Sequence, residues 1–151
     1  MIFAIGYWVG NGKNQLSGYG VLVVAHGSLA EGLLEAASMI VGKTENSQAV
    51  CFDSTQGVEG LEKAVQAALD QFTNCDGVHC LVDIPGGSPA RVVAAQSFKR
   101  KGVEIISGVS LPMLIEALFA REDQSLKELA QTAVQAGVDG VLDLGARLHE
   151  S

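Results

Sequence analysis

Basic residues and aromatic residues are both scarce in this chain, and no hydrophobic run is long enough to cross a membrane. Ten Lys and Arg stand against 17 Asp and Glu among 151 residues, which gives a formal net charge of −7. This charge argues against nucleic acid or an anionic membrane as a partner. The apolar segment at residues 1–9 is about half of the ~20 residues that a spanning helix needs, and it lacks the features of a signal peptide. We therefore expect a cytoplasmic protein with no direct membrane insertion.

Cysteine is also rare. Cys51, Cys75 and Cys80 are odd in number and lack CxxC spacing, a pattern typical of buried thiols in a reducing compartment. A zinc site built on Cys75, His79 and Cys80 would need a further ligand from elsewhere in the chain, so we expect no metal and no cofactor.

Three common site motifs are missing as well. No Walker lysine follows a glycine-rich loop, and no GxGxxG follows the first predicted strand, so the sequence gives no support for nucleotide binding. GxSxG is absent too, which argues against a serine hydrolase.

What the chain does contain is a regular alternation of strand and helix patterns after residue 20. Each predicted strand is a short apolar or β-branched run that ends near a turn residue; these strands are Gly20–Ala25, Gln48–Phe52, Val78–Asp83, Val103–Ser107 and a short final one at Val138–Leu144. The helices expected between them carry apolar residues at helical spacing; they run from Ser28 to Val41, from Val58 to Phe72, from Ser88 toward Gly102, over Leu111–Arg121, and from Ser125 to Gly137. This order predicts an α/β three-layer sandwich, a mostly parallel sheet with helices on both faces. We divide the chain into an N-terminal extension of unknown role (1–19) and one domain (20–151).

Among the polar residues, His26 stands out because it ends the first apolar strand. Gly27 can turn the chain, and Ser28 with Glu31 has the spacing of a helix capping box. His26 is therefore expected at the carboxyl edge of the sheet, where open α/β sheets bind their ligands. A histidine at that edge can be a nucleophile, a base or a metal ligand.

A carboxylate at the same edge narrows these roles. Asp83 ends its strand as His26 ends its own, and neighbouring strand ends bring such side chains within hydrogen-bond reach. A carboxylate on Nδ1–H holds the imidazole in one tautomer and leaves Nε2 as a free lone pair. We therefore predict His26 and Asp83 as the catalytic pair.

Gly86, Gly87 and Ser88 supply backbone N–H groups, a hydroxyl and a helix N-terminus, which together suit a phosphate group. Ser28 and Ser110 are expected first as helix caps and in addition as phosphate contacts at the same edge. A histidine nucleophile, an orienting aspartate and a phosphate site together indicate phosphoryl transfer through phosphohistidine.

Three segments resemble a known family. The run from Ala25 to Leu34, the Val82-Asp83 pair with Gly86-Gly87-Ser88-Pro89, and the run from Gly108 to Leu114 are similar to the motifs of the mannose-type enzyme IIA family. These are domains of the bacterial phosphoenolpyruvate–sugar phosphotransferase system. The resemblance covers about residues 20 to 145.

The resemblance implies that His26 accepts a phosphoryl group on Nε2 from the phosphocarrier HPr and passes it to a IIB domain. Asp83 then orients His26, and Ser88 with the Gly86-Gly87 backbone binds the phosphoryl oxygens. Members of the family are cytoplasmic homodimers whose final strand exchanges between subunits, a role for which Val138–Leu144 is placed. An acidic chain also suits the basic docking face of HPr.

The sequence departs from the family pattern at three positions. Ala25 stands where the family often has Ser, Pro85 where an aromatic residue is common, and Ser110 where Asn is frequent. Two alternatives stay open. Ala-His-Gly-Ser after an apolar strand also resembles metal chelatases, although no second metal-binding side chain is evident, and a IIA-like regulatory module would have an identical site.

Overall fold

A computed structural model of the chain describes residues 18–120 and 124–150. The expected extension at 1–19 therefore lies almost wholly outside the described residues, as does Arg121, the expected end of the fourth helix. No helix among the described residues has the length and apolar character needed to cross a membrane.

The sheet has four parallel strands in the order β2-β1-β3-β4. The strands are β1 (Gly20–His26), β2 (Ser47–Phe52), β3 (Val78–Val82) and β4 (Val103–Ser107). β1 pairs with β2 on one side and β3 on the other, and every residue of β1 before His26 is buried. This explains its continuous apolar sequence, because both faces of a parallel strand are covered.

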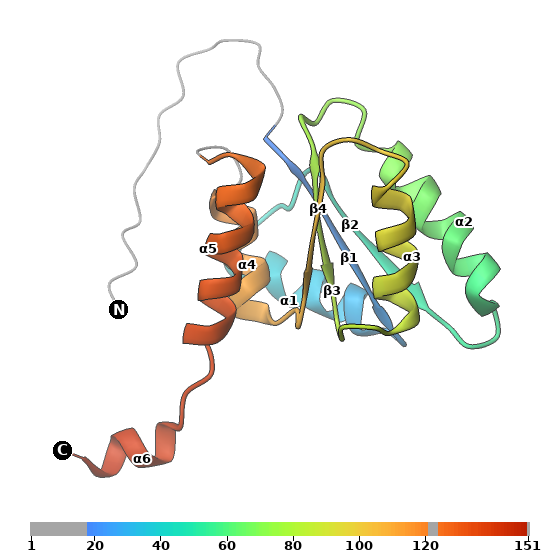
Figure 1. Cartoon of the computed structure of the whole chain (residues 1–151). Helices are drawn as coiled ribbons and strands as arrows, with labels where there is room; N and C mark the ends of the chain where they lie inside the picture. The colour runs from blue at the N-terminus through green and yellow to red at the C-terminus, as the bar shows by residue number, and fades with distance from the viewer. Residues whose placement is uncertain (1–17, 121–123, 151) are drawn as a thin grey trace.

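Helices cover both faces of the sheet (Figure 1). One layer holds α1 (Leu29–Val41), α4 (Leu111–Ala120) and α5 (Leu126–Asp139), and the other holds α2 (Gly57–Asp70) and α3 (Ser88–Ser97). Alternate residues of β1 enter two separate cores: Leu22 and Val24 pack under α2 and α3, while Val21 and Val23 pack under α1 and α4. The predicted three-layer α/β sandwich is confirmed.

The predicted final strand at Val138–Leu144 is wrong. Val138 belongs to α5, residues 141–143 have no regular structure, and Leu144 begins α6 (Leu144–His149), which extends away from the sandwich in Figure 1. A strand requires a neighbour with which to share its backbone hydrogen bonds, and this segment has none within the described chain.

The end of α5 differs from the sequence prediction because of how α5 packs on α4. Gly137 was expected to end the helix, but α5 continues to Asp139 and Gly140 follows it. A Cβ on Gly137 would lie 2.8 Å from Met113 Cε, and one on Gly140 would lie 2.6 Å from Pro112 Cγ. Both glycines therefore permit the close approach of α5 to α4. In the sequence, a glycine needed for such packing cannot be told from a glycine that ends a helix.

Candidate functional site

His26 and Asp83 meet at the carboxyl edge of the sheet, as predicted. His26 ends β1, Asp83 follows the last residue of β3, and the two strands are paired in parallel. The Asp83 Oδ2 atom accepts two hydrogen bonds from His26, from the backbone N–H at 2.8 Å and from ring Nδ1 at 2.6 Å. One carboxylate oxygen thus fixes both the backbone and the ring of this histidine.

The electrostatics of the pair favour an ionised carboxylate. Burial by itself raises the pKa of Asp83, but hydrogen bonds from the His26 backbone and ring and from the Ile84 N–H outweigh it and hold the pKa below its usual value. An ionised Asp83 selects the tautomer with hydrogen on Nδ1. Within residues 18–120 and 124–150 no group hydrogen-bonds to Nε2, and 45% of the His26 side chain is exposed, against 11% for Asp83. The arrangement therefore presents an oriented Nε2 lone pair to solvent.

Two further groups hold the imidazole in place. The Phe52 ring, at the end of β2, meets the His26 ring edge to face, with a centroid separation of 5.5 Å. On another side, a Cβ built on Gly87 would lie 3.2 Å from His26 Cε1, so only glycine leaves the ring its full space there. The sequence prediction included Gly87 but missed Phe52. The sequence shows only that Phe52 ends a strand as His26 does; the strand order that pairs β2 with β1 comes from the structure.

The Gly86-Gly87-Ser88 turn leads directly into α3. Gly86 has φ +78°, a conformation that favours glycine, and Gly87 is the extended N-cap residue. Ser88 is the first residue of α3, so its hydroxyl does not cap the helix. The first N–H groups of a helix have no partner within the helix. Since no side chain of the described residues caps α3, these donors are open at the turn where Gly87 approaches the His26 ring, and they suit an anion.

Helix α1 begins next to the site in the same uncapped state. Ser28 is its N-cap residue, but its side chain makes no capping hydrogen bond, so the expected capping box with Glu31 is not formed. Ser110, by contrast, does cap its helix: its Oγ accepts a hydrogen bond from Met113 N (3.4 Å) and lies against the α4–α5 contact at Gly137. Ser28 is thus exposed two residues from His26, whereas the Ser110 hydroxyl is engaged with α4.

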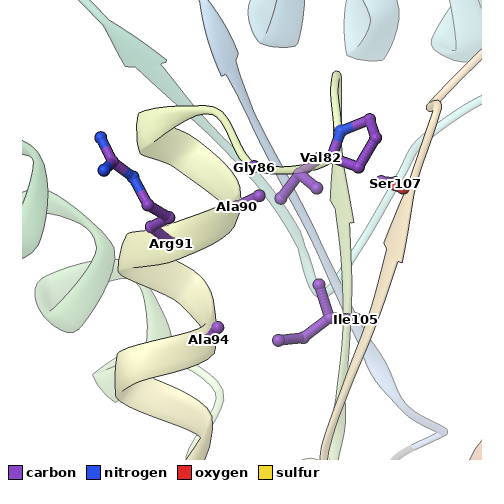
Figure 2. A pocket seen from close by; sticks show the side chains of 8 residues that line it. Val82, Gly86, Ala90, Arg91, Ala94, Ile105 and Ser107 are labelled. Carbon is purple, nitrogen blue, oxygen red and sulfur yellow. The ribbon is translucent and has the colours of Figure 1, made fainter.

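A cavity of about 340 Å³ adjoins the same turn, between α3 and β4 (Figure 2). Its lining is mostly apolar and consists of Val82, Pro85, Gly86, Ala90, Arg91, Ala94, Ile105 and Ser107. Arg91 was not predicted as a site residue. Its guanidinium Nη2 lies 3.5 Å from Ser88 Oγ, so a positive charge is present one helical turn from the candidate phosphate site.

The arrangement does not suit a metal. Within the described ranges no three His, Cys, Asp or Glu side chains are grouped to hold an ion. His79, considered with Cys75 and Cys80 as a zinc ligand, is fully buried near the start of β3. It therefore lies at the opposite end of the strand from Asp83 and cannot assist His26.

Comparison with known proteins finds several relatives described as components of a phosphotransferase system (PTS). The sequence model of the family described as "PTS system fructose IIA component" matches residues 20–134. The chain is 37% identical over 128 residues to the mannose-specific EIIAB component of Escherichia coli. The aligned region covers 84% of this chain but only 40% of that longer protein. It is 34% identical over 109 residues to the fructose-specific EIIA component of Bacillus subtilis, covering 72% of this chain and 75% of the relative. The mannose/sorbose-specific IIA subunit from Enterococcus faecalis superposes with a TM-score of 0.77 at 26% identity, over 83% of this chain and 94% of that one.

Proposed function

Since this chain belongs to the mannose-type IIA family of the sugar phosphotransferase system, we propose that it relays phosphoryl groups through a phosphohistidine at His26. The family expected from the sequence motifs is confirmed. The observation that carries the histidine's role is the short Nδ1 to Asp83 hydrogen bond, which leaves Nε2 exposed and available.

The chemistry follows from that geometry. The Nε2 lone pair attacks the phosphorus of a phosphohistidine donor, a new N–P bond forms, and the donor's N–P bond breaks with its electron pair returning to the donor imidazole. The His26 ring becomes positively charged as the bond forms, and the ionised Asp83 on Nδ1–H stabilises that charge. Transfer to the next protein is the same exchange in reverse.

The incoming phosphoryl oxygens require hydrogen-bond donors. Gly87 precedes α3, and a Cβ built on it would lie 3.2 Å from His26 Cε1. We assign the donors to the open N–H groups at the start of α3, the Gly86 and Gly87 backbone and the Ser88 hydroxyl. Ser28 at the uncapped start of α1 is a further donor on the His26 side. Ser110 is assigned to helix capping first, because its Oγ already accepts from α4.

The partners follow from the relay. We assign phospho-HPr as donor and a IIB domain as acceptor, both meeting the exposed face of His26 in the cytoplasm. The net charge of −7 favours encounter with a basic donor surface. No bound group is needed for the reaction, so no cofactor is assigned.

A homodimer is the assembly that fits the exposed apolar surface. The end of α5 and the segment after it expose several large apolar side chains, namely Val138, Val141, Leu142, Leu144 and Leu148. β4 is an edge strand, and the mostly apolar cavity between α3 and β4 lies open beside it. Such surfaces on separate copies are suited to cover each other. Light scattering should give twice the chain mass, and a monomer at micromolar concentration would refute this assignment.

Phosphorylation itself is tested with enzyme I, HPr and labelled phosphoenolpyruvate. The wild-type chain should take up an acid-labile label, and His26→Ala should take up none. The exposed His149 at the far end of α6 provides a matched control, since His149→Ala should label like wild type. Label that persists in His26→Ala would place the phosphoryl group elsewhere and end the proposal.

A further inference from the structure

We propose that Arg91 is a positioning residue for phosphoryl transfer, acting through the Ser88 hydroxyl. This inference rests on the proposed phosphohistidine at His26. It concerns a side chain that the family motif residues identified above do not include.

The first observation is the position of the charge. Arg91 is the fourth residue of α3, and a positive charge in the first turn opposes the helix dipole. Helix stability therefore does not account for an arginine here. A second cavity, of about 320 Å³, lies between α2 and α3, and both Arg91 and Glu62 line it. The Arg91 side chain is exposed and nevertheless forms no ion pair within residues 18–120 and 124–150. The guanidinium thus remains available to an anion.

The second observation is the direction of the side chain. In Figure 2, the Arg91 side chain points away from Ile105 and toward the end of α3 that follows the Gly86 turn. Its Nη2 donates to Ser88 Oγ at 3.5 Å. Residues 88 and 91 lie on one face of the helix, because they are separated by three positions.

The third observation is what this bond does to the hydroxyl. A serine hydroxyl has one hydrogen to donate and two lone pairs. Arg91 occupies one lone pair, so the hydroxyl hydrogen must point away from the guanidinium. Among the described residues no acceptor bonds to that hydrogen. A Cβ on Gly87, the residue before Ser88, would lie 3.2 Å from His26 Cε1, so the turn that carries Ser88 borders the His26 ring. We assign a phosphoryl group on Nε2 as the acceptor for this hydrogen.

The charge also strengthens the donor. A hydrogen bond from a cation polarises the hydroxyl and makes its own hydrogen a better donor. Arg91 thereby adds positive potential at the site without a direct hydrogen bond to the phosphoryl oxygens. Phosphoryl oxygens that gain negative charge during transfer are stabilised most by such fixed donors.

The test compares two phosphoryl donors. Phospho-HPr has a docking surface, whereas phosphoramidate is a small donor with none; with it, the Nε2–P bond forms as the donor P–N bond breaks and ammonia leaves. Arg91→Ala should slow labelling of His26 about tenfold with both donors, and Arg91→Lys should recover part of the rate. The matched control is Lys99→Ala, which removes an exposed positive charge beyond the other end of α3 and should change neither rate.

A double-mutant cycle separates positioning from direct contact. If Arg91 acts through Ser88, then Arg91→Ala should have no further effect in a Ser88→Ala background. Slowing confined to phospho-HPr would make Arg91 a docking residue, and additive losses would make it act without Ser88; either result overturns the inference. Melting curves check folding, and Arg91→Ala should melt no lower than wild type. If the wild-type chain takes label from neither donor, the phosphohistidine itself is refuted, whereas a labelled wild type with an unaffected Arg91→Ala refutes only the role of Arg91.

Discussion

Replacing His79 with leucine should stabilise the protein, and the gain should grow as the pH falls. His79 is fully buried in β3, and within the described part of the chain neither of its ring nitrogens has a hydrogen-bond partner. Burial lowers its pKa to about 4 from an ordinary 6.5, because a charged imidazole loses its hydration inside the core.

The sign and size of the pH effect follow from linkage. The unfolded chain binds a proton at His79 as the pH falls through 6.5, whereas the folded chain resists it down to about 4. The unfolded state therefore gains stability over that window, and the free energy of unfolding falls. For these two pKa values, the loss between pH 7.5 and pH 5 is about 2 kcal/mol.

Leucine has nearly the volume of histidine and no polar atom. At pH 7.5, His79→Leu should raise the free energy of unfolding by about 1 kcal/mol, because an unsatisfied ring N–H is removed from the core. At pH 5 the gap should widen to about 3 kcal/mol. Urea unfolding at the two pH values measures both gaps, and acid losses from Asp83 and Glu128 occur in both proteins and cancel. A gap that stays the same at both pH values, or a variant less stable at pH 7.5, would refute the reasoning.

Three further predictions concern the site and its helices. Asp83→Asn should slow phosphorylation of His26 about a hundredfold while circular dichroism stays native, since an amide holds the ring but cannot stabilise its charge; an unchanged rate would remove Asp83 from the mechanism. Gly87→Ala should also slow labelling, about tenfold, because the added Cβ presses on the His26 ring, and a wild-type rate would show that the ring has room. Ser125→Ala breaks a complete capping box on α5 and should lower the free energy of unfolding in urea by about 1 kcal/mol, with labelling unchanged. Ser28→Ala should lower it far less, because Ser28 makes no capping hydrogen bond. Equal costs for the two serines would contradict the uncapped start of α1.

The sequence was sufficient where one local rule decides the outcome. The short apolar run before His26 is typical of a strand covered on both faces, and parallel strands bring their carboxyl ends to one edge. These two rules together predict the His26–Asp83 pair from the sequence. Ser125 and Glu128 have the spacing of a capping box, which depends only on the local sequence, and both of its hydrogen bonds are present.

The sequence was insufficient where contacts between residues far apart in the chain override a local pattern. Ser28 has the sequence of a capping box but a different backbone geometry (φ −91°, ψ 9°) beside the site. Gly137 looks like a helix end and is instead a contact point for Met113. Phe52 reads as an ordinary strand residue, since only the sheet order places it against His26.

The double hydrogen bond from His26 to Asp83 has a kinetic consequence. Because backbone and ring are tied to the same carboxylate oxygen, Nε2 is fixed relative to the sheet and offers a single approach from solvent. In the proposed relay, the donor protein and the acceptor protein must therefore occupy the same space in turn. Steady-state transfer should obey a ping-pong scheme, in which each partner at high concentration inhibits the other competitively.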